Sequence, residues 1–228
     1  MEQTALNLMA IGVFATALSS LLGPVFNISP AIPAVTTLGI MGLATLDNLS
    51  WGGKGTTLLL DRFSSPQQRQ RVLHHEAGHF LVAYLLGIPV TGYTLNAWEA
   101  FKKGQPGMGG VIVDTEQLEK INIKETPLMV ERFCTVWMAG IAAENLVYGN
   151  AQGGESDRQK IREVLRVAGF PESVYTQKER WALLQTKSLL EKHQKAYEAL
   201  VKAMEKRASV EECLQAIRQH SQVESRSS

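Results

Sequence analysis

The stretch His74-His75-Glu76-Ala77-Gly78-His79 determines how the rest of the chain is interpreted, because it contains the pattern H-E-x-x-H at His75, Glu76 and His79. Residues four apart on a helix share one face, with Cβ atoms about 5–6 Å apart. Two imidazoles at that spacing can bind one tetrahedral Zn²⁺ through bonds of roughly 2.0–2.1 Å. Glu76 follows the first histidine, where it can act as general base on a water at the metal. Three of the five histidines lie in this stretch, which favours a zinc site over histidines that only cap or pair with neighbours.

The flanking residues predict that this pattern lies on a helix from about Pro66 to Leu86. Ser65-Pro66-Gln67-Gln68 has the pattern of a capping box, with Pro66 at the first helical position, where its missing N–H has no cost. Gly87 suits the left-handed position after a helix, and Pro89 cannot continue one. Apolar residues at helical spacing supply a face for burial: Val72, Leu73, Phe80, Leu81, Tyr84 and Leu85.

Length and charge set the broad class. With 228 residues the chain has room for one ordinary domain and an additional segment. Its net charge of +1 gives no basic face for nucleic acid, so we expect no nucleic-acid partner. Cys134 and Cys213 lie far apart in helical stretches and are expected to be reduced core thiols, as in a cytoplasm-like compartment. We expect the domain with the histidines at 65–220, followed by a polar tail at 221–228.

The N-terminus predicts a hydrophobic helical hairpin at residues 1–47, anchored in a membrane. No charged residue occurs between Glu2 and Asp47. The run from Ala5 to Phe26 is long enough to cross a bilayer core, which takes about 20 residues. After a break at Asn27-Ile28-Ser29-Pro30, Ala31 to Leu46 forms a second, shorter apolar run. A cleaved signal peptide fits less well, because there is no basic region before the apolar run and the run is too long.

Two further inferences concern the setting of this hairpin. The alternative to a membrane anchor is a hydrophobic hairpin that packs on a soluble domain, which its many Gly, Ser and Thr residues would allow. If both ends of the anchor lie on one side, the following domain faces the side that carries Lys54, Arg62, Arg69 and Arg71. The positive-inside rule places that side in the cytoplasm or its organellar equivalent.

Residues 48–64 are expected to be a flexible linker, and their glycines do not form a nucleotide-binding loop. Such a loop requires G-x-x-x-x-G-K-[ST]. In this chain Gly55 follows Lys54, and Asn48 occupies the position of the first glycine. We therefore predict no ATPase in this chain.

The residues after the histidine helix predict a small β element. Val90 to Asn96 and Val111 to Val113 are rich in β-branched residues and flank the glycine-rich segment Gly104 to Gly110. A hairpin or short sheet fits this pattern, and an ordinary loop is the alternative. An edge strand near the metal could bind an extended peptide by main-chain hydrogen bonds, and Gly109 would permit its close approach.

A second long helix is predicted from Thr126-Pro127 to a stop at Gly149. Its segment Ala139 to Glu144 contains small residues that allow close packing of a neighbouring helix. Glu144 lies in apolar surroundings, where a carboxylate requires a partner. Either it binds the free ring N–H of a metal-ligating histidine, or it forms a salt bridge at the surface.

A catalytic zinc site requires a third protein ligand and an open position. His193 and His220 lie in highly charged helices, so we expect a carboxylate. Asp157 and Glu155 follow the glycine-rich segment from Gly149 and precede a helix predicted from Arg158 to Ala168. Acidic residues at a helix start are also expected from capping, so spacing alone does not assign the ligand.

The C-terminal part, Thr176 to His220, is predicted to be helical and highly charged. Thr176 with Glu179, and Ser209 with Glu212, have the spacing of capping boxes. An apolar stripe predicts a packing or oligomerisation layer: Leu183, Leu189, Leu190, Tyr197, Leu200, Val201 and Met204.

Taken together, these motifs resemble the peptidase domain of FtsH, the membrane-anchored zinc protease. The matching stretches are His75 to Ala83, Ala139 to Glu144 with Val147 to Gly149, and Gly153 to Asp157, within a region from about Ser65 to Ala208. The resemblance implies a mainly α fold with a small β element, a helical zinc-peptidase domain preceded by the hydrophobic hairpin. It also implies zinc on His75, His79 and Asp157, with Glu76 as the catalytic base.

The chain departs from that family in two respects. The family's Gly-Gly-Arg-x-Ala-Glu-Glu has Ala139, Ile141 and Asn145 in place of a Gly, the Arg and the second Glu. The ATPase module is absent, so the chain resembles the ATPase-less relatives of cyanobacteria and plastids. That likeness implies an inner or thylakoid membrane, a domain on the cytoplasmic or stromal side, a homo-hexamer, and room for a separate ATPase partner.

The expected function is a membrane-anchored zinc metalloendopeptidase that cleaves unfolded or loosely structured polypeptides. The alternative is a non-proteolytic, membrane-anchored zinc-binding scaffold or adaptor. A third class, an intramembrane protease, is disfavoured because Arg69, Arg71 and His74 lie just before the motif.

Overall fold

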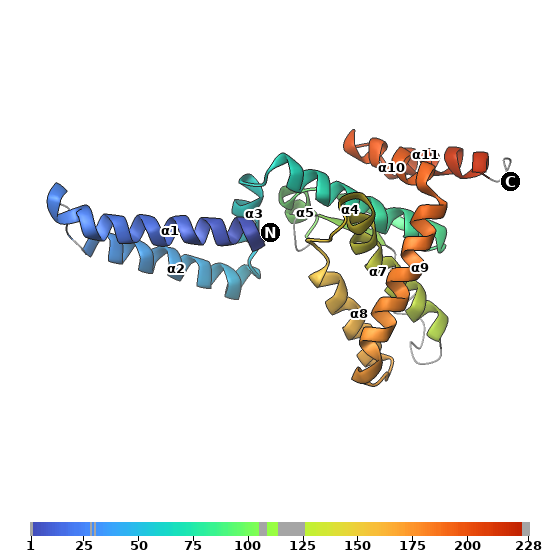
Figure 1. The fold of residues 1–228 in the computed structure, drawn as a ribbon, viewed down its shortest axis with the longest axis horizontal. Coiled ribbons are helices and arrows are strands. Elements are labelled where there is room, and N and C mark those ends of the chain that lie inside the picture. Colours follow the sequence, from blue (N-terminus) through green and yellow to red (C-terminus); the bar gives the residue numbers. More distant parts are fainter. Residues whose placement is uncertain (1, 28, 30, 105–108, 114–125, 225–228) are drawn as a thin grey trace. The chain divides into compact units, whose positions relative to one another are not determined.

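A computed structural model of the chain describes residues 2–27, 29, 31–104, 109–113 and 126–224 (Figure 1). The described part is mainly helical with one two-stranded sheet, which confirms the predicted fold class at that level. Outside the described residues lie Ile28 and Pro30 of the predicted break, 105–108 of the glycine-rich segment and 225–228 of the polar tail.

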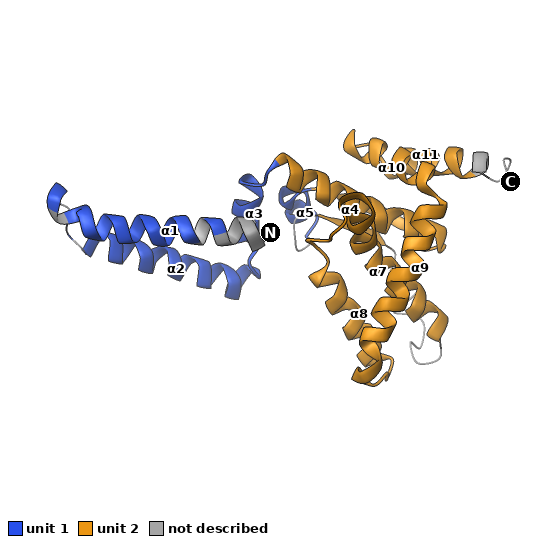
Figure 2. Cartoon of the chain, in the orientation of Figure 1, with its two compact units in different colours: residues 1–65, 96–108 blue, residues 66–95, 109–228 orange. Residues whose placement is uncertain are grey.

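The chain divides into two compact units (Figure 2). Unit 1 comprises residues 1–65 and 96–108, and unit 2 comprises residues 66–95 and 109–228. The segment 96–108, which lies between the two strands in sequence, thus belongs to the same unit as the N-terminal helices.

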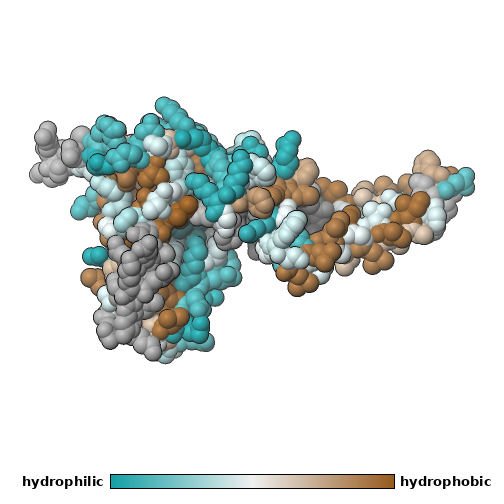
Figure 3. Space-filling model, turned by 180° about the vertical axis from the view of Figure 1, so that it is seen from behind, coloured by the Kyte–Doolittle hydropathy of each residue, from teal (hydrophilic) through white to brown (hydrophobic). Residues whose placement is uncertain are grey.

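Unit 1 begins with two helices that pack against each other. They are α1 (Glu2–Leu22) and α2 (Ala31–Trp51), connected through the short 3₁₀ helix η1 (Gly23–Phe26). Many of their large apolar side chains are exposed, and brown hydrophobic residues alternate with paler ones on the drawn face of this part of the chain in Figure 3. Exposed apolar surface of this extent is typical of a membrane or protein contact.

Among the described helices, α2 alone is long and apolar enough to cross a membrane. Its 21 residues correspond to about 31 Å at 1.5 Å per residue, the thickness of a hydrocarbon core. In α1 the apolar stretch among the described residues is Ala10–Leu22. Helix α2 continues to Trp51, beyond the predicted end of the second apolar run at Leu46.

The predicted flexible linker after the hairpin is largely helical. Helix α3 (Lys54–Arg62) follows α2 after a turn at Gly52 and Gly53, whose φ angles are 59° and 77°. The Asp47 carboxylate accepts hydrogen bonds from the N–H and hydroxyl of Thr56 at 2.7 and 2.8 Å. The glycines therefore form a defined elbow, because they supply the left-handed turn that the capped helix requires.

In unit 2 His74, His75 and His79 lie on α4 (Pro66–Leu85), a helix one residue shorter than predicted. Gly87 has φ 70°, and the N–H of Ile88 donates to the carbonyl of Ala83 at 2.9 Å. This is the left-handed helix end that the glycine predicted.

The predicted β element is confirmed as a two-stranded antiparallel sheet. Strand β1 (Val90–Thr94) pairs with β2 (Gly110–Val113), with Val90 opposite Val113 and Thr94 opposite Gly110. Both strands contact α4. The short helix α5 (Ala97–Lys102) lies between them in sequence.

Helix α7 (Pro127–Tyr148) has the predicted bounds and ends at Gly149, whose φ is 76°. It packs closely on α4 because Gly78 faces small residues. A Cβ added at Gly78 would lie 2.5 Å from the carbonyl oxygen of Ala139 and 2.8 Å from Cβ of Ala143. The small-residue segment therefore has the packing role that the sequence predicted.

The C-terminal helices bury the predicted apolar stripe within unit 2, with Leu190, Leu200 and Met204 almost fully buried. Cys134 and Cys213 are free and buried, as expected of core thiols. The elements are α8 (Glu155–Val167), η3 (Glu172–Val174), α9 (Tyr175–Lys192), α10 (Gln194–Glu205) and α11 (Val210–Glu224).

One of the two predicted capping boxes forms. The N–H of Ser209 donates to the Glu212 carboxylate at 2.7 Å, and the N–H of Glu212 donates to the Ser209 hydroxyl at 3.3 Å. The prediction for Glu179 was wrong, because that buried carboxylate binds Arg158 and Arg162 at 2.9 and 3.0 Å. Two guanidinium groups from α8 compensate its burial better than one backbone N–H would.

Candidate metal centre

Three buried side chains converge in unit 2: His75 and His79 from α4, and Asp157 from α8. The Asp157 Oδ2 atom lies 3.1 Å from Nε2 of His75 and 3.5 Å from Nε2 of His79. Metal bonds of 2.0–2.1 Å in tetrahedral geometry place ligand atoms roughly 3.3–3.4 Å apart. These separations therefore fit one small divalent cation.

The structure brings Asp157 to the histidines and not Glu155, the other acidic candidate. Helix α8 begins three residues before its predicted start, at Glu155 after Gly154, whose φ is 98°. Both acids consequently lie in the first helical turn and point in different directions. Asp157 is buried at 5% exposure, whereas Glu155 is exposed.

Hydrogen bonds orient both histidine rings. Nδ1 of His75 lies 2.8 Å from Glu144 Oε1, and Nδ1 of His79 lies 2.7 Å from the carbonyl oxygen of Val136. A carboxylate and a carbonyl only accept hydrogen bonds, so each Nδ1 carries a proton. Each ring thus directs Nε2 toward Asp157, the orientation that a metal ligand requires.

A glycine provides the space for one of these rings. A Cβ added at Gly140 would overlap Nε2, Cδ2 and Cε1 of His75. Any larger residue at that position would displace the ring. Gly140, which the sequence shares with the FtsH pattern, is therefore required in this chain because a side chain there would collide with the His75 ring.

Glu144 connects the metal cluster to the loop that precedes α8. Besides His75, its carboxylate accepts hydrogen bonds from the N–H groups of Gln152 and Gly153 at 2.9 and 3.2 Å. It also binds Arg71 at 3.2 Å. The predicted contact with the histidine ring is therefore present together with a salt bridge, and the carboxylate is buried and not at the surface.

The charges of the cluster favour a bound cation, since three carboxylates, Glu76, Glu144 and Asp157, adjoin the two imidazoles. Burial opposes a charge on His75, yet hydrogen bonds to Asp157 and Glu144 outweigh it and raise the pKa of His75 to about 10. Burial likewise opposes ionisation of Asp157, but the nearby histidines hold its pKa well below the usual value. A proton on Nε2 of His75 occupies the position that a metal ion would take.

Glu76 differs from the other groups of the cluster, because one of its buried carboxylate oxygens has no hydrogen-bond partner among the described residues. This atom is Oε2, and the residue is 6% exposed. Burial raises the pKa of this carboxyl. A Cβ added at Gly109 would lie 3.2 Å from Glu76 Oε1, so the carboxylate lies beside the segment that leads into β2. A buried unsatisfied carboxylate next to two histidines fits a site that receives a metal and water.

The chain matches no protein-family model and no curated protein. The resemblance to FtsH therefore depends on the three motifs, and the metal centre depends on its own geometry.

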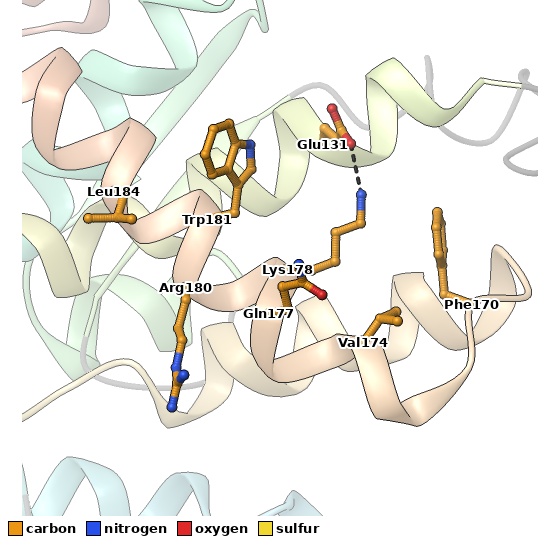
Figure 4. A pocket seen from close by; sticks show the side chains of 8 residues that line it. All are labelled: Glu131, Phe170, Val174, Gln177, Lys178, Arg180, Trp181 and Leu184. Atoms are coloured by element: carbon orange, nitrogen blue, oxygen red, sulfur yellow. Dashed lines mark hydrogen bonds and ion pairs between the residues drawn. The ribbon is translucent and has the colours of Figure 1, made fainter.

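A separate groove of about 510 Å³ lies along α9 of unit 2 (Figure 4). Trp181 and Lys178 lie in it, and Lys178 binds Glu131 at 2.8 Å. None of its lining residues belongs to the metal cluster. They are Glu131, Phe170, Val174, Gln177, Lys178, Arg180, Trp181 and Leu184.

Arg71 is a functional candidate that the sequence analysis did not single out as such. It lies one helical turn before His75, and its guanidinium binds Glu144 and also Asn150, at 3.1 Å to the carbonyl and 2.9 Å to the side chain. It also lies over the ring of Tyr148 at 4.3 Å. Its spacing from His75 was the available signal, because residues four apart share a helix face.

We expect Arg71→Gln to weaken zinc binding by about 10–100-fold, the usual effect of losing a residue that orients a ligand. Without the guanidinium, Glu144 loses its salt bridge and Asn150 loses two hydrogen bonds, so Glu144 and the loop before α8 are held less firmly. Competition with a chromophoric chelator measures the affinity. Arg69→Gln, at an exposed position on the same helix, should leave it unchanged. Equal affinity of Arg71→Gln and wild type would contradict the orienting role.

Proposed function

We propose that the chain is a membrane-anchored zinc metalloendopeptidase of the FtsH type that hydrolyses unfolded or loosely structured polypeptides. One observation carries the proposal: two Nε2 atoms of an H-E-x-x-H helix and a distant carboxylate converge, with the uncommitted Glu76 carboxylate beside them. Metal-assisted hydrolysis requires this combination of a ligand set and an adjacent base.

In this mechanism His75, His79 and Asp157 hold the metal, and Glu144 keeps the His75 ring in place. Bound Zn²⁺ supplies Lewis acidity toward a water and toward a peptide carbonyl. Glu76 accepts the proton of the attacking water and delivers it to the leaving amine. The burial of Glu76 supports this role, because a raised pKa brings a carboxylate closer to the strength that a general base needs near neutral pH.

The substrate is an extended polypeptide that lies along β2. In support, β2 pairs with β1 and with no other strand among the described residues. Gly109, the residue before β2, lies beside Glu76, so a peptide paired with this strand would extend close to the Glu76 carboxylate. An extended peptide on a strand edge gains main-chain hydrogen bonds regardless of its sequence. A tightly folded protein does not offer a free extended segment, so the substrates are unfolded segments and loose termini.

The cellular setting is also part of the proposal. Helix α2 anchors the chain in an inner or thylakoid membrane, with the metal unit on the cytoplasmic or stromal side. The FtsH resemblance adds a homo-hexamer to the proposal and leaves room for a separate ATPase partner. What supports the anchor is the length and apolar composition of α2.

Metal removal and reconstitution test the function. The full chain, purified in detergent, is incubated with a fluorescently labelled unfolded protein. We expect cleavage by the zinc-loaded protein, loss of cleavage after chelation, and recovery with stoichiometric Zn²⁺ but not with Mg²⁺, which prefers octahedral oxygen ligands. A non-proteolytic scaffold would bind zinc without cleavage in any of these states. That result would overturn the peptidase proposal and retain the metal site.

A further inference from the structure

We propose that α3 and α5 form a lipid-binding platform in unit 1, with their outward apolar side chains in the headgroup region of the bilayer that α2 crosses. The platform consists of Leu59 and Phe63 at α3, and Trp98 and Phe101 on α5. This inference rests on the membrane anchoring in the proposed function and is independent of the proposed catalysis.

Helix α5 exposes its large residues and buries its small ones. Ala97 and Ala100 are buried, whereas Trp98 is 54% and Phe101 is 44% exposed. The two exposed rings stack with centroids 6.0 Å apart, and the Lys102 ammonium lies 5.1 Å from the centre of the Trp98 ring. Water favours the opposite arrangement, with large apolar groups inside. A partner with an apolar surface therefore explains this helix better than water does.

The C-terminal end of α3 also exposes large apolar side chains. Leu59 is 57% and Phe63 is 60% exposed, and residues at this four-residue spacing on a helical turn share one face. Arg62, next to them, is also exposed. An exposed apolar face with a basic residue beside it is typical of helices that lie in a membrane interface.

A hydrogen bond joins α3 to α5, and a side-chain cap fixes the start of α5. Asp61 of α3 accepts a hydrogen bond from the N–H of Ala97 at 3.1 Å, at the start of α5. Asn96 caps α5 by accepting from the N–H of Glu99 at 2.8 Å, and its amide donates to the Glu99 carboxylate at 2.9 Å. Asp61 and Glu99, the two acidic residues of these helices, thus accept hydrogen bonds from within unit 1.

The basic residues at α3 and α5 are Lys54, Arg62, Lys102 and Lys103. Basic side chains next to a span are attracted to anionic lipid headgroups, and tryptophan is enriched at the same depth. Aromatic rings together with basic residues match a lipid interface better than they match an apolar protein surface.

The platform is continuous with the candidate span. Helix α2 ends at Trp51, which is 68% exposed. The elbow at Gly52 and Gly53 then starts α3 directly, with Asp47 as its cap. If α2 crosses the bilayer, α3 therefore begins where the headgroups begin. Because α5 lies between β1 and β2 in sequence, the bilayer would also hold a helix from the connection between the two strands of the proposed peptide-binding sheet.

Fluorine NMR on the full chain in lipid nanodiscs tests the platform. The four tryptophans are labelled with 5-fluorotryptophan and assigned by single substitution of each by phenylalanine. The nanodiscs contain phosphatidylcholine and phosphatidylglycerol, with a lipid spin-labelled near the headgroup. We expect broadening of the Trp98 and Trp51 resonances. Trp181, which is 56% exposed but lies on unit 2, is the matched control and should remain sharp.

The outcomes separate the platform from the anchor. A sharp Trp98 resonance with a broadened Trp51 resonance would overturn the platform and keep the anchor. If both remain sharp, the anchoring itself fails, and the platform fails with it. Replacing phosphatidylglycerol by phosphatidylcholine should reduce the broadening of Trp98, because the basic residues then lose their attraction. A Trp98 resonance protected from both the lipid label and a soluble gadolinium chelate would instead indicate a protein contact, and would also overturn the proposal.

Discussion

Replacing Glu76 by Gln should reduce peptide cleavage by about 10²–10⁴-fold, the contribution of a positioned general base, while zinc remains bound. Glutamine has the size of glutamate, so the buried site keeps its packing. It cannot accept the proton of the attacking water. Metal retention is expected because Glu76 is not among the residues whose ligand atoms converge. The measurements are zinc content of the purified protein and the rate of degradation of an unfolded substrate.

The control for this experiment is Glu172→Gln, which removes an exposed carboxylate of the same unit and should alter neither quantity. Loss of both zinc and activity in Glu76→Gln would show that the substitution disrupts the site and would not identify a base. Full activity in Glu76→Gln with zinc bound would end the assignment of the peptidase function. The zinc content thus shows whether a loss of activity comes from the missing base or from disruption of the metal site.

Replacing Asp157 by Ala should abolish stoichiometric zinc binding and, with it, cleavage. Oδ2 of Asp157 faces both imidazoles at 3.1 and 3.5 Å, and no other acid meets both histidines in the described cluster. The loss of affinity should exceed the roughly 10–100-fold expected of a residue that only orients a ligand. Titration with Zn²⁺ against a competing chelator measures the affinity, and circular dichroism checks that the helices persist.

Glu155→Gln provides a matched control, because Glu155 lies two residues away in the same helical turn but is exposed. It should bind zinc as the wild type does. Asp157→Asn adds a second comparison, since it keeps the size of the side chain and removes the charge. If Asp157→Ala retained the affinity of the wild type, the third ligand would lie elsewhere, and the geometric basis of the centre would be wrong.

The sequence predicted well whatever depends on neighbours along the chain. The bounds of α4 and α7 follow from Pro66, Gly87, Pro127 and Gly149, which act through local backbone geometry. The convergence of His75 and His79 follows from helical periodicity within one element. The elbow after α2 was missed because glycines at positive φ and flexible glycines have the same sequence pattern, and only the capping by Asp47 distinguishes them.

The long-range parts of the site could not be derived from spacing. Asp157 lies 82 residues from His75 along the chain, and Glu144 lies 69 residues away. Whether Asp157 or Glu155 lies beside the histidines depends on the residue at which α8 begins and on its rotation about its own axis. The packing of α8 on α7 helps to set that start and that rotation. A shift of α8 by one residue would rotate its side chains by about 100°. The sequence alone therefore left the choice open.

The sequence by itself determined the helical class, the histidine pair with its adjacent glutamate, and the apolar N-terminal run, because each depends on local periodicity or composition. The tertiary structure alone decided which carboxylate completes the cluster, that Glu144 and Val136 orient the two rings, and that Arg71 ties the loop before α8 to Glu144. The physical reason is that these contacts join α4, α7 and α8, whose relative positions depend on how their small and apolar faces pack in the folded chain.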